Sequence, residues 1–505
     1  MTSAQRERRG SVQLADLIAA LKQRRVQKVR DSNVHGVTSD SRTVEAGDVF
    51  VAVRGGGLDG HNFVAEAAGK GAVALVTEEP VNVRGPVNIV VPDSTRALGE
   101  LASRFFGDPA GKLRMFGVTG TNGKTSTAHM FRAICEHSRA LGGMGIVGTV
   151  GHGTGSTLEA SVHTTPEPVT LHRLLRQMVD SGCNGVVMEV SSHAVRQQRI
   201  WGLDFEIGML TNVTRDHLDY HSSFEDYADA KREFCLSLVS EHRSGEPGTL
   251  VYSRDNEITR GIGQDFPGQK VATSIVGKGD VYADNVEATL EGTRFDLHLG
   301  GDAVAVSMKL LGSFTAANAT LAAAAAYTLG IEGATIRDGL ESVQRVPGRF
   351  DALGGSGKPV VVVDYSHTPD SLERTLQFCR GLQPRRLIVV FGCGGDRDRG
   401  KRPLMGGIAQ ENCDVCYVTS DNPRTEDPRR IIDEILSGMD TGKKGTTVEV
   451  DRRKAIRAAI ESSGPRDLVA VCGKGHEDYQ IIGTARYHFD DREEASKALH
   501  VWSGR

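Results

Sequence analysis

The sequence contains no apolar run long enough to span a membrane. A helix needs about 20 consecutive apolar residues to cross a bilayer, and no stretch of the 505 residues approaches that length. The first ten residues, MTSAQRERRG, also lack the apolar core of a signal peptide. We therefore expect a cytoplasmic protein with no membrane partner.

An excess of charge of one sign is also missing. Lys and Arg number 60 against 64 Asp and Glu, which leaves a formal net charge of −4. A chain without a basic field has little to attract nucleic acid. We expect no nucleic-acid partner and, with no other association signal, a monomer.

The eight cysteines show no disulfide framework. Cys393 in VVFGCGG and Cys472 in VAVCGKG stand in apolar runs, which is typical of buried free thiols. Cys413 and Cys416 form a CxxC pair, but no second Cys or His pair lies nearby. This favours a chance pair entering a core strand over a redox or metal site.

The chain is too long for a single hydrophobic core, and its pattern divides into three parts. Residues 1–111 alternate strand-like runs such as VFVAVRG and GAVALVTEE with the helical runs VQLADLIAALKQ and STRALGELASRFFG. Residues 112–345 repeat strand, loop and helix. They add alternating runs such as VYADNVEATLEGTRFDLHL, which predict antiparallel hairpins, and an Ala-rich run, FTAANATLAAAAAYTLG, which predicts a buried helix.

Residues 346–505 carry near-continuous apolar strands such as PVVVVD and RRLIVVF, which predict a parallel sheet covered on both faces. The predicted fold class is therefore α/β with three domains. They are a small N-terminal α/β domain, a central P-loop-type mononucleotide-binding domain with a parallel sheet, and a C-terminal Rossmann-like domain. Polar clusters follow the ends of many strands, where open α/β sheets bind ligands.

A phosphate-binding loop is the clearest motif. The run GTNGKTS comprises Gly120, Thr121, Asn122, Gly123, Lys124, Thr125 and Ser126. Glycine N–H groups and a helix N-terminus form an anion site, Lys adds positive charge, and a Thr hydroxyl can reach Mg²⁺. Val118 occupies the place of the first glycine of the standard P-loop. The strand before and the helix after favour a shortened variant over accident, and a plain turn would leave Lys124 and Thr125 unexplained.

Two acidic features follow in the central region. Glu189 ends the strand-like run NGVVMEV, and it can either serve a phosphate-bound Mg²⁺ or cap the next helix. The run TNVTRDHLDYH supplies Asp216, His217, Asp219 and His221. That cluster suits a second metal or a phosphate relay, or else a solvated loop.

The runs GTNGKTS, TTPEP, MEVSSHA, TNVTRDHLDYH and GCGGDRDRGKRPLM together resemble the Mur ligases of peptidoglycan synthesis, in order and over nearly the whole chain. The resemblance implies an ATP-dependent ligase that adds an amino acid to UDP-MurNAc-L-Ala-D-Glu. ATP phosphorylates the D-Glu side-chain carboxylate, and an amine then attacks the acyl phosphate. Lys124 and two Mg²⁺ ions would neutralise the charge between the anionic reactants.

The same resemblance implies roles for individual residues. Thr125 and Glu189 would hold one magnesium ion, and Glu189, His217 and a carbamate on Lys231 would serve the other. Without the resemblance, Lys231 in FEDYADAKREF reads as a surface helix residue. The catalytic set is thus Lys124, Glu189, His217 and Lys231. Beyond the loop, the ATP-binding positions are Asn318, Arg349, Asp364 and His367.

The positions implied for the nucleotide-sugar dipeptide are Ser41, Thr164, Thr165, Ser191, Gln197 and Arg199. The sequence departs from the usual family pattern at His163, Thr315 and Ser366, where relatives often carry Asn, Asn and Ala. The run TSDNPRTEDP resembles the signature of ligases that add meso-2,6-diaminopimelate. Its distal carboxylate would meet Arg424, a planar bidentate partner; L-lysine carries only an ammonium there. The implied amino-acid set is Arg397, Asp421, Asn422, Pro423, Arg424, Gly473 and Glu477.

Other readings stay open at this point. Arg424 can instead cap a helix or pair with Glu426. The amino acid added can be lysine or another, or the chain can be another Mur or folylpolyglutamate-type ligase. A nucleotide-binding scaffold without turnover is the reading from a different class, although Lys124, Thr125, Glu189, His217 and Lys231 are all present.

Overall fold

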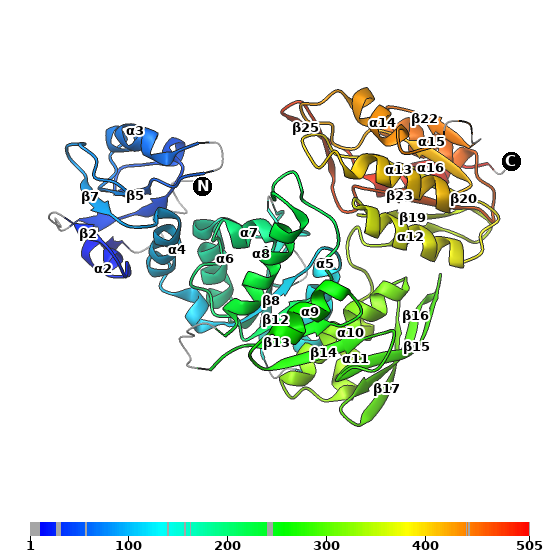
Figure 1. Cartoon of the computed structure of the whole chain (residues 1–505), viewed down its shortest axis with the longest axis horizontal. Coiled ribbons are helices and arrows are strands. Elements are labelled where there is room, and N and C mark those ends of the chain that lie inside the picture. The colour runs from blue at the N-terminus through cyan, green and yellow to red at the C-terminus, as the bar shows by residue number, and fades with distance from the viewer. Residues whose placement is uncertain are drawn as a thin grey trace. The chain divides into compact units, whose positions relative to one another are not determined.

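Parallel sheets with helices on both faces make up most of the fold, which confirms the α/β prediction (Figure 1). The computed structural model describes residues 11–26, 32–55, 58–138, 141–155, 158–161, 163–239, 246–440, 442 and 445–503. The opening segment MTSAQRERRG lies outside the described residues.

The chain forms two units. Unit 1 consists of Met1–Gly117, Leu141–Gly208 and Leu236–Gly248, and unit 2 of Val118–Ala140, Met209–Cys235 and Thr249–Arg505. The division falls inside three elements, β8 (Arg114–Thr119), β12 (Ile207–Leu210) and α8 (Phe224–Ser237). The domain bounds expected near residues 111 and 345 stay a prediction.

Unit 1 begins with a sheet in the order β2-β7-β6-β5-β4, in which β4 to β7 are parallel and β2 is antiparallel. Alternate side chains of a strand face opposite sides. Val49 and Val51 pack with α2 and α4, while Phe50 packs with α3. The elements are β2 (Arg25–Val26), β4 (Gly36–Thr38), β5 (Asp48–Val51), β6 (Ala74–Thr77), β7 (Val87–Val90), α2 (Leu14–Ile18), α3 (Val64–Gly69) and α4 (Ser94–Phe105).

The first predicted helix is much shorter than its sequence pattern indicates. Within VQLADLIAALKQ only Leu14–Ile18 is helical. At its start β1 (Val12–Gln13) pairs with β3 (Asn33–Val34), and at its end the chain turns at Ala19 and Ala20. Strand pairing therefore outweighs local helix propensity at the start of this run.

The rest of unit 1 carries strands in the order β10-β9-β11. β9 (Gly143–Val147) is parallel to β11 (Cys183–Glu189) and antiparallel to β10 (His152–Gly153). Helix α6 (Pro168–Asp180) packs on β11, and the short α7 (Ser192–Arg196) follows that strand.

Unit 2 contains the helix after the phosphate loop, α5 (Lys124–Ser138), with α10 and α11 packed on it. Gly339 of α11 lets the helices approach closely, since a Cβ there would lie 2.5 Å from Ile134 Cα. The predicted hairpins are confirmed, because β15, β16 and β17 are antiparallel. The elements are β13 (Thr249–Ser253), α9 (Glu257–Asp265), β14 (Lys270–Ser274), β15 (Val281–Thr289), β16 (Gly292–Leu299), β17 (Asp302–Met308), α10 (Ser313–Thr328) and α11 (Gly333–Ser342).

The end of unit 2 is a sheet in the order β18-β19-β23-β20-β21-β22, parallel except for β18. Val362 packs with α12 to α14, and its neighbours Val361 and Val363 pack with α15 and α16. Apolar side chains are therefore needed at every position, as predicted. The elements are β18 (Asp351–Gly354), β19 (Val360–Asp364), β20 (Leu387–Phe391), β21 (Val415–Val418), β22 (Thr446–Val448), β23 (Leu468–Cys472), α12 (Pro369–Gly381), α13 (Lys401–Asn412), α14 (Pro428–Leu436), α15 (Arg452–Glu461) and α16 (Asp491–Val501).

A buried ion pair joins α15 to α16. Arg452 Nε and Nη2 each donate to a carboxylate oxygen of Asp491 at 2.7 Å, and both side chains are completely buried. Nη2 also donates to the Cys472 carbonyl at the end of β23, at 3.0 Å. This pair fixes the last helix of the chain to the sheet.

All eight cysteines are free thiols, as expected. Cys416 lies in β21 and is buried, and Cys413 directly follows α13. The CxxC pair is thus the entry to a core strand.

Candidate active site

The phosphate loop joins β8 to α5 and needs its glycines for space. Gly120 has φ +143°, and a Cβ there would lie 1.8 Å from the Thr211 hydroxyl oxygen. Gly123 has φ +86°, and a Cβ there would lie 2.3 Å from Asn318 Oδ1. Both the backbone angles and the neighbours exclude a side chain. The predicted ATP-binding residue Asn318 therefore lies directly against the loop.

Two lysine ammonium groups meet at one carbonyl of the loop. Lys124 Nζ donates to the carbonyl oxygens of Gly120 and Thr121 at 2.8 and 2.9 Å. Lys231 Nζ donates to the same Gly120 oxygen at 2.9 Å. The two predicted catalytic lysines are thus neighbours.

Lys231 is not a surface residue, which corrects the interpretation of its helix from sequence alone. Its side chain is 1% exposed, and Nζ lies 4.4 Å from the centre of the Tyr227 ring. Helix α8 turns Tyr227, Lys231 and Phe234 to its buried side. Burial, together with the charge of Lys124, lowers the pKa of Lys231 well below its usual value. The neutral amine is favoured as a result.

Arg349 reaches the start of α5. Its Nη2 donates to the hydroxyl of the buried Thr125 at 2.9 Å, and its guanidinium stacks over the Tyr365 ring at 4.8 Å. Its Nε is buried without a hydrogen-bond partner. Asp364, predicted with it, accepts from Phe350 N at 2.8 Å and from the Ser366 hydroxyl.

Asp216 is the centre of a histidine cluster. Its Oδ2 lies 3.4 Å from His217 Nε2 and 3.9 Å from His367 Nε2. Burial alone would raise the pKa of Asp216, but the charges of His217, Lys401 and His367 reverse that and hold it below its usual range. Asp216 and His221 are 4% and 3% exposed, so the alternative of a solvated loop is wrong for these two residues.

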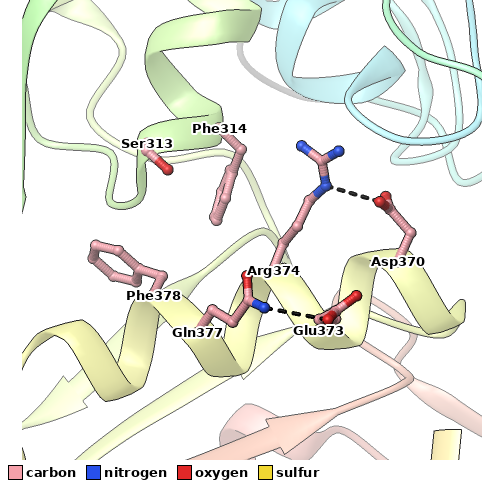
Figure 2. Close-up of a pocket in the computed structure, with 7 residues that line it drawn as sticks. All are labelled: Ser313, Phe314, Asp370, Glu373, Arg374, Gln377 and Phe378. Carbon is pink, nitrogen blue, oxygen red and sulfur yellow. Dashed lines mark hydrogen bonds and ion pairs between the residues drawn. The ribbon is translucent and has the colours of Figure 1, made fainter. Parts of the chain in front are cut away.

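A pocket of about 510 Å³ lies between the start of α10 and the outer side of α12 (Figure 2). Figure 2 shows Phe314 and Phe378 on one side of it and the ion pair between Arg374 and Asp370 on the other. Asp370 also accepts from Asn122 Nδ2 of the phosphate loop at 2.9 Å. The pocket is thus connected to the loop by one hydrogen bond, and its aromatic and polar walls suit a flat heterocycle. Its lining is Ser313, Phe314, Asp370, Glu373, Arg374, Gln377 and Phe378.

Unit 1 holds a second polar network at the carboxyl end of β11. Glu189 is 1% exposed and accepts from the Thr149 N–H and hydroxyl at 2.8 and 3.0 Å. The Thr149 and Thr164 hydroxyls lie 3.0 Å apart. Thr165 donates its hydroxyl to the Glu189 carbonyl at 2.8 Å and accepts from Ser191 N at 3.1 Å. Glu189 does not cap the next helix, because the Ser191 side chain is the N-cap of α7.

Arg199 completes this network. It donates to the Thr165 carbonyl at 2.7 Å and to Gln197 Oε1 at 2.9 Å, and it pairs with Glu167 at 2.8 Å. Five of the six residues predicted for the nucleotide-sugar dipeptide therefore form a single cluster. Ser41 is apart from it in the described hydrogen bonds, and instead donates to Glu66 Oε2 at 3.1 Å.

In unit 2, the predicted amino-acid residues converge at the carboxyl ends of β20, β21 and β23, as the sheet rule requires. Arg424 Nη1 donates to the Gly395 carbonyl at 2.8 Å. A Cβ at Gly394 would lie 2.9 Å from Arg424 Nη1 and 3.7 Å from Arg397 Cγ. A Cβ at Gly395 would lie 1.9 Å from the Pro423 carbonyl oxygen. The two glycines thus let both arginines share one small region.

Arg424 neither caps a helix nor pairs with Glu426. Glu426 pairs with Arg402 at 2.7 Å, and α14 is capped by Asp427. Among the described residues no carboxylate lies within ion-pair distance of the half-buried Arg424. Arg424 also adopts φ +51°, which is uncommon for a residue with a side chain. Its guanidinium therefore remains available to an anion.

A second cluster lies beside Arg424. Asn422 Nδ2 donates to Glu477 Oε2 at 2.8 Å, and Lys474 Nζ donates to the same oxygen at 2.9 Å. Burial raises the pKa of Glu477. Burial would also raise the pKa of Asp421, but Lys474 and Arg452 lower it below its usual value. Gly473 has φ +123°, and a Cβ there would lie 2.7 Å from Asp421 Oδ2.

Sequence reasoning missed three polar residues of these clusters. Thr149 holds both oxygens of Glu189, and its position just after the apolar run MGIV was a usable signal. Lys474 is fully buried beside Glu477. The charge of Lys401 lowers the pKa of Asp216. Lys401 gave no signal, because the charged run RDRGKR reads as solvated.

Three family models match the chain in order. They are described as "Mur ligase family, catalytic domain" over residues 33–106, "Mur ligase middle domain" over 118–326 and "Mur ligase, glutamate ligase domain" over 348–475. A protein of Geobacillus thermodenitrificans named UDP-N-acetylmuramoyl-L-alanyl-D-glutamate--2,6-diaminopimelate ligase is 42% identical over 475 residues, which cover 94% of this chain and 96% of that protein. The chain belongs to the Mur ligase family.

Further relatives support the assignment of this chain to the Mur ligase family. A protein of the same name from Gloeobacter violaceus is 44% identical over 93% of this chain and 94% of its own length. A solved structure of a ligase with that name has 31% identity and a TM-score of 0.67, and covers 97% of this chain and 99% of its own. Both resemblance and fold class predicted from the sequence are thereby confirmed.

Two features are absent from the described part of the Mur ligase. No helix there is long and apolar enough to cross a membrane. No three His, Cys, Asp or Glu side chains gather there as a metal site. The predicted magnesium ligands are not such a group of three, because two of them are the Thr125 hydroxyl and a modified Lys231.

Proposed function

We propose that this Mur ligase uses ATP to add meso-2,6-diaminopimelate to UDP-MurNAc-L-Ala-D-Glu. The observation that carries the proposal is Arg424, a half-buried cation with no described carboxylate partner at the carboxyl end of β21. A carboxylate at the far end of the added amino acid would supply the missing partner, and Arg recognises carboxylates in a bidentate fashion. L-lysine offers an ammonium at that position, which Arg424 would repel.

The reaction first transfers a phosphoryl group to a carboxylate and then joins the activated acyl group to an amine. A carboxylate oxygen of D-Glu attacks the γ-phosphorus of ATP, and the bond to the leaving ADP oxygen breaks. The amine nitrogen then attacks the acyl carbon, loses a proton, and phosphate departs. Lys124 and the glycine loop suit the phosphate part of this reaction, since they combine N–H groups, a helix start and a cation.

The adenine base is assigned to the pocket between α10 and α12. Phe314 and Phe378 offer aromatic faces there, and Asp370 connects the pocket to Asn122 of the phosphate loop at 2.9 Å. Replacing Phe314 with Ala should raise the KM for ATP more than the KM for the amino acid. An unchanged KM for ATP in steady-state assays would refute this assignment.

Magnesium fits the donor set by its chemistry. Oxygen ligands suit this ion. In unit 1 Glu189 offers a carboxylate, and in unit 2 Thr125, His217 and a carbamate on Lys231 would take part. The bound ions would neutralise the phosphates and polarise the transferred group. The low pKa of Lys231 supports the carbamate, because only a neutral amine attacks carbon dioxide.

The test supplies the purified chain with ATP, Mg²⁺ and UDP-MurNAc-L-Ala-D-Glu, and compares diaminopimelate, lysine and glutamate as third substrate. Phosphate release and the mass of the product are measured together. We expect the amide product with diaminopimelate and far less with lysine. Equal turnover with lysine would refute the specificity, and absence of amino-acid-dependent phosphate release would favour a scaffold without turnover.

A further inference from the structure

Lys401 has a buried stem, and its ammonium lacks a partner among the described residues. It is the first residue of α13 and is 6% exposed. Within the described part of the chain, its ammonium has neither a hydrogen-bond acceptor nor a carboxylate at ion-pair distance. Its neighbour Arg402 is also buried but pairs with Glu426 and Glu434 at 2.7 and 2.8 Å. The stem of Lys401 is thus buried while its ammonium reaches solvent, where an anionic ligand can bind it.

The positive charge of Lys401 lowers pKa values in the cluster around Asp216. Together with burial it lowers the pKa of His367 to about 4, and it lowers the pKa of Asp216 as well. The loop before Lys401 also touches this region, since Arg215 Nε lies 3.7 Å from Asp398 Oδ2. Lys401 is therefore close to the segment that carries His217.

Lys401 is expected to bind a different chemical group from the carboxylates expected at Arg397 and Arg424. Arg397 and Arg424 already flank Gly394, where two carboxylates of an amino acid would find bidentate partners. Lysine is a compact point charge and is a common partner of phosphate oxygens. The group expected beside His217 in the proposed reaction is the phosphate that moves from ATP to the carboxylate.

We propose that Lys401 Nζ binds the oxygens of the phosphoryl group during its transfer, as a further catalytic residue of this ligase. The inference rests on the proposed function. The bond from phosphorus to the ADP oxygen breaks and the bond to the D-Glu carboxylate oxygen forms, while Lys401 stays an ammonium throughout. Its charge offsets the negative charge that the transferred group carries between the two oxygens.

The test compares Lys401→Met, which keeps the buried stem, with Lys401→Arg and with Lys454→Met. Lys454 is an exposed lysine on α15 outside the site and serves as the matched control. We expect Lys401→Met to lower kcat by roughly 10²- to 10³-fold with little change in the KM for ATP or diaminopimelate. Lys401→Arg should keep more activity, and the control should match wild type.

Thermal unfolding separates loss of the fold from loss of catalysis. Lys401→Met keeps the buried stem and removes no hydrogen bond or ion pair of the described residues, so its melting temperature should stay near that of wild type. A full kcat, or a raised KM for diaminopimelate at unchanged kcat, would overturn the inference while leaving the proposed function intact. If wild type itself forms no amide, the proposed function fails and this inference fails with it.

Discussion

Three lysines in the described part of the chain have largely buried side chains, and the neighbours of their ammonium groups differ. Lys474 pairs with Glu477 at 2.9 Å. Lys231 donates to a carbonyl oxygen and has a lowered pKa. Lys401 has no described partner. The surroundings of the three ammonium groups differ, and on this ground we propose a structural role for Lys474, a carbamate for Lys231 and phosphoryl binding for Lys401.

Arg424 should decide the choice of amino acid. Arg424→Ala is expected to lower kcat/KM for diaminopimelate by at least about 10²-fold, because a carboxylate loses its bidentate partner. The KM for ATP should stay near the wild-type value, since Arg424 does not contact the phosphate loop in the described hydrogen bonds. Steady-state kinetics with each substrate varied in turn checks this. Equal losses for both substrates would contradict the assigned role.

Lys231→Ala should abolish ligation, because the proposed carbamate is lost. A small carboxylic acid added to the assay should restore part of the activity by occupying the vacated space beside Gly120. Mass spectrometry of the wild-type chain under mild conditions should find one extra carboxyl group on Lys231. Lys454→Ala, a change at an exposed lysine on α15 outside the site, is the control and should keep full activity.

At the scale of elements, the sequence predicted whether a segment forms a helix or a strand better than it predicted the length of the element or its contacts. The strand, loop and helix around Lys124, the antiparallel hairpins and the Ala-rich helix are all confirmed. The long first helix was wrong, and at its start the reason is the pairing of Val12 with Val34, which depends on a segment that a local pattern does not include. The burial of Lys231 was missed for the same kind of reason. Its helix mixes charged with apolar residues, and the carbonyl that accepts its hydrogen bond belongs to Gly120, more than 100 positions away.

Gly339 should control where α5 lies, and thereby the phosphate loop at its start. Gly339→Ala places a Cβ 2.5 Å from Ile134 Cα, and such overpacking costs about 1 to 3 kcal/mol. We expect a lower melting temperature and a higher KM for ATP. Gly333→Ala on the same helix is the matched control, since its Cβ would lie 3.4 Å from two flexible side chains. A destabilised Gly333→Ala and an unaffected Gly339→Ala would contradict this account.

At the scale of the whole molecule, several histidines make stability depend on pH. Burial lowers the pKa of His152 from 6.5 to about 4, and it likewise lowers those of His129 and His476. Between those values the unfolded chain binds protons that the folded chain does not, so stability falls as pH falls from 6.5 toward 4. The exposed His488, whose pKa is raised by Glu493, acts in the opposite sense.

The contribution of His152 can be measured in unit 1. We expect His152→Gln to reduce the loss of unfolding free energy between pH 7 and pH 5 by about 2 kcal/mol. Fluorescence of Trp201 reports on unit 1 once Trp502, in unit 2, is replaced by Phe. An identical pH dependence with and without His152 would show that its proton binding does not differ between the folded and unfolded chain.

The Arg452 and Asp491 pair has a consequence for biosynthesis. Asp491 follows Arg452 by 39 residues in the sequence and is therefore synthesised later, and until then Arg452 lacks its anion. Domains fold as units during translation, and a missing buried partner is strongly unfavourable. The sheet that contains β23 therefore completes its folding only once α16 has been synthesised, and a product truncated before this helix should be less stable and more readily degraded.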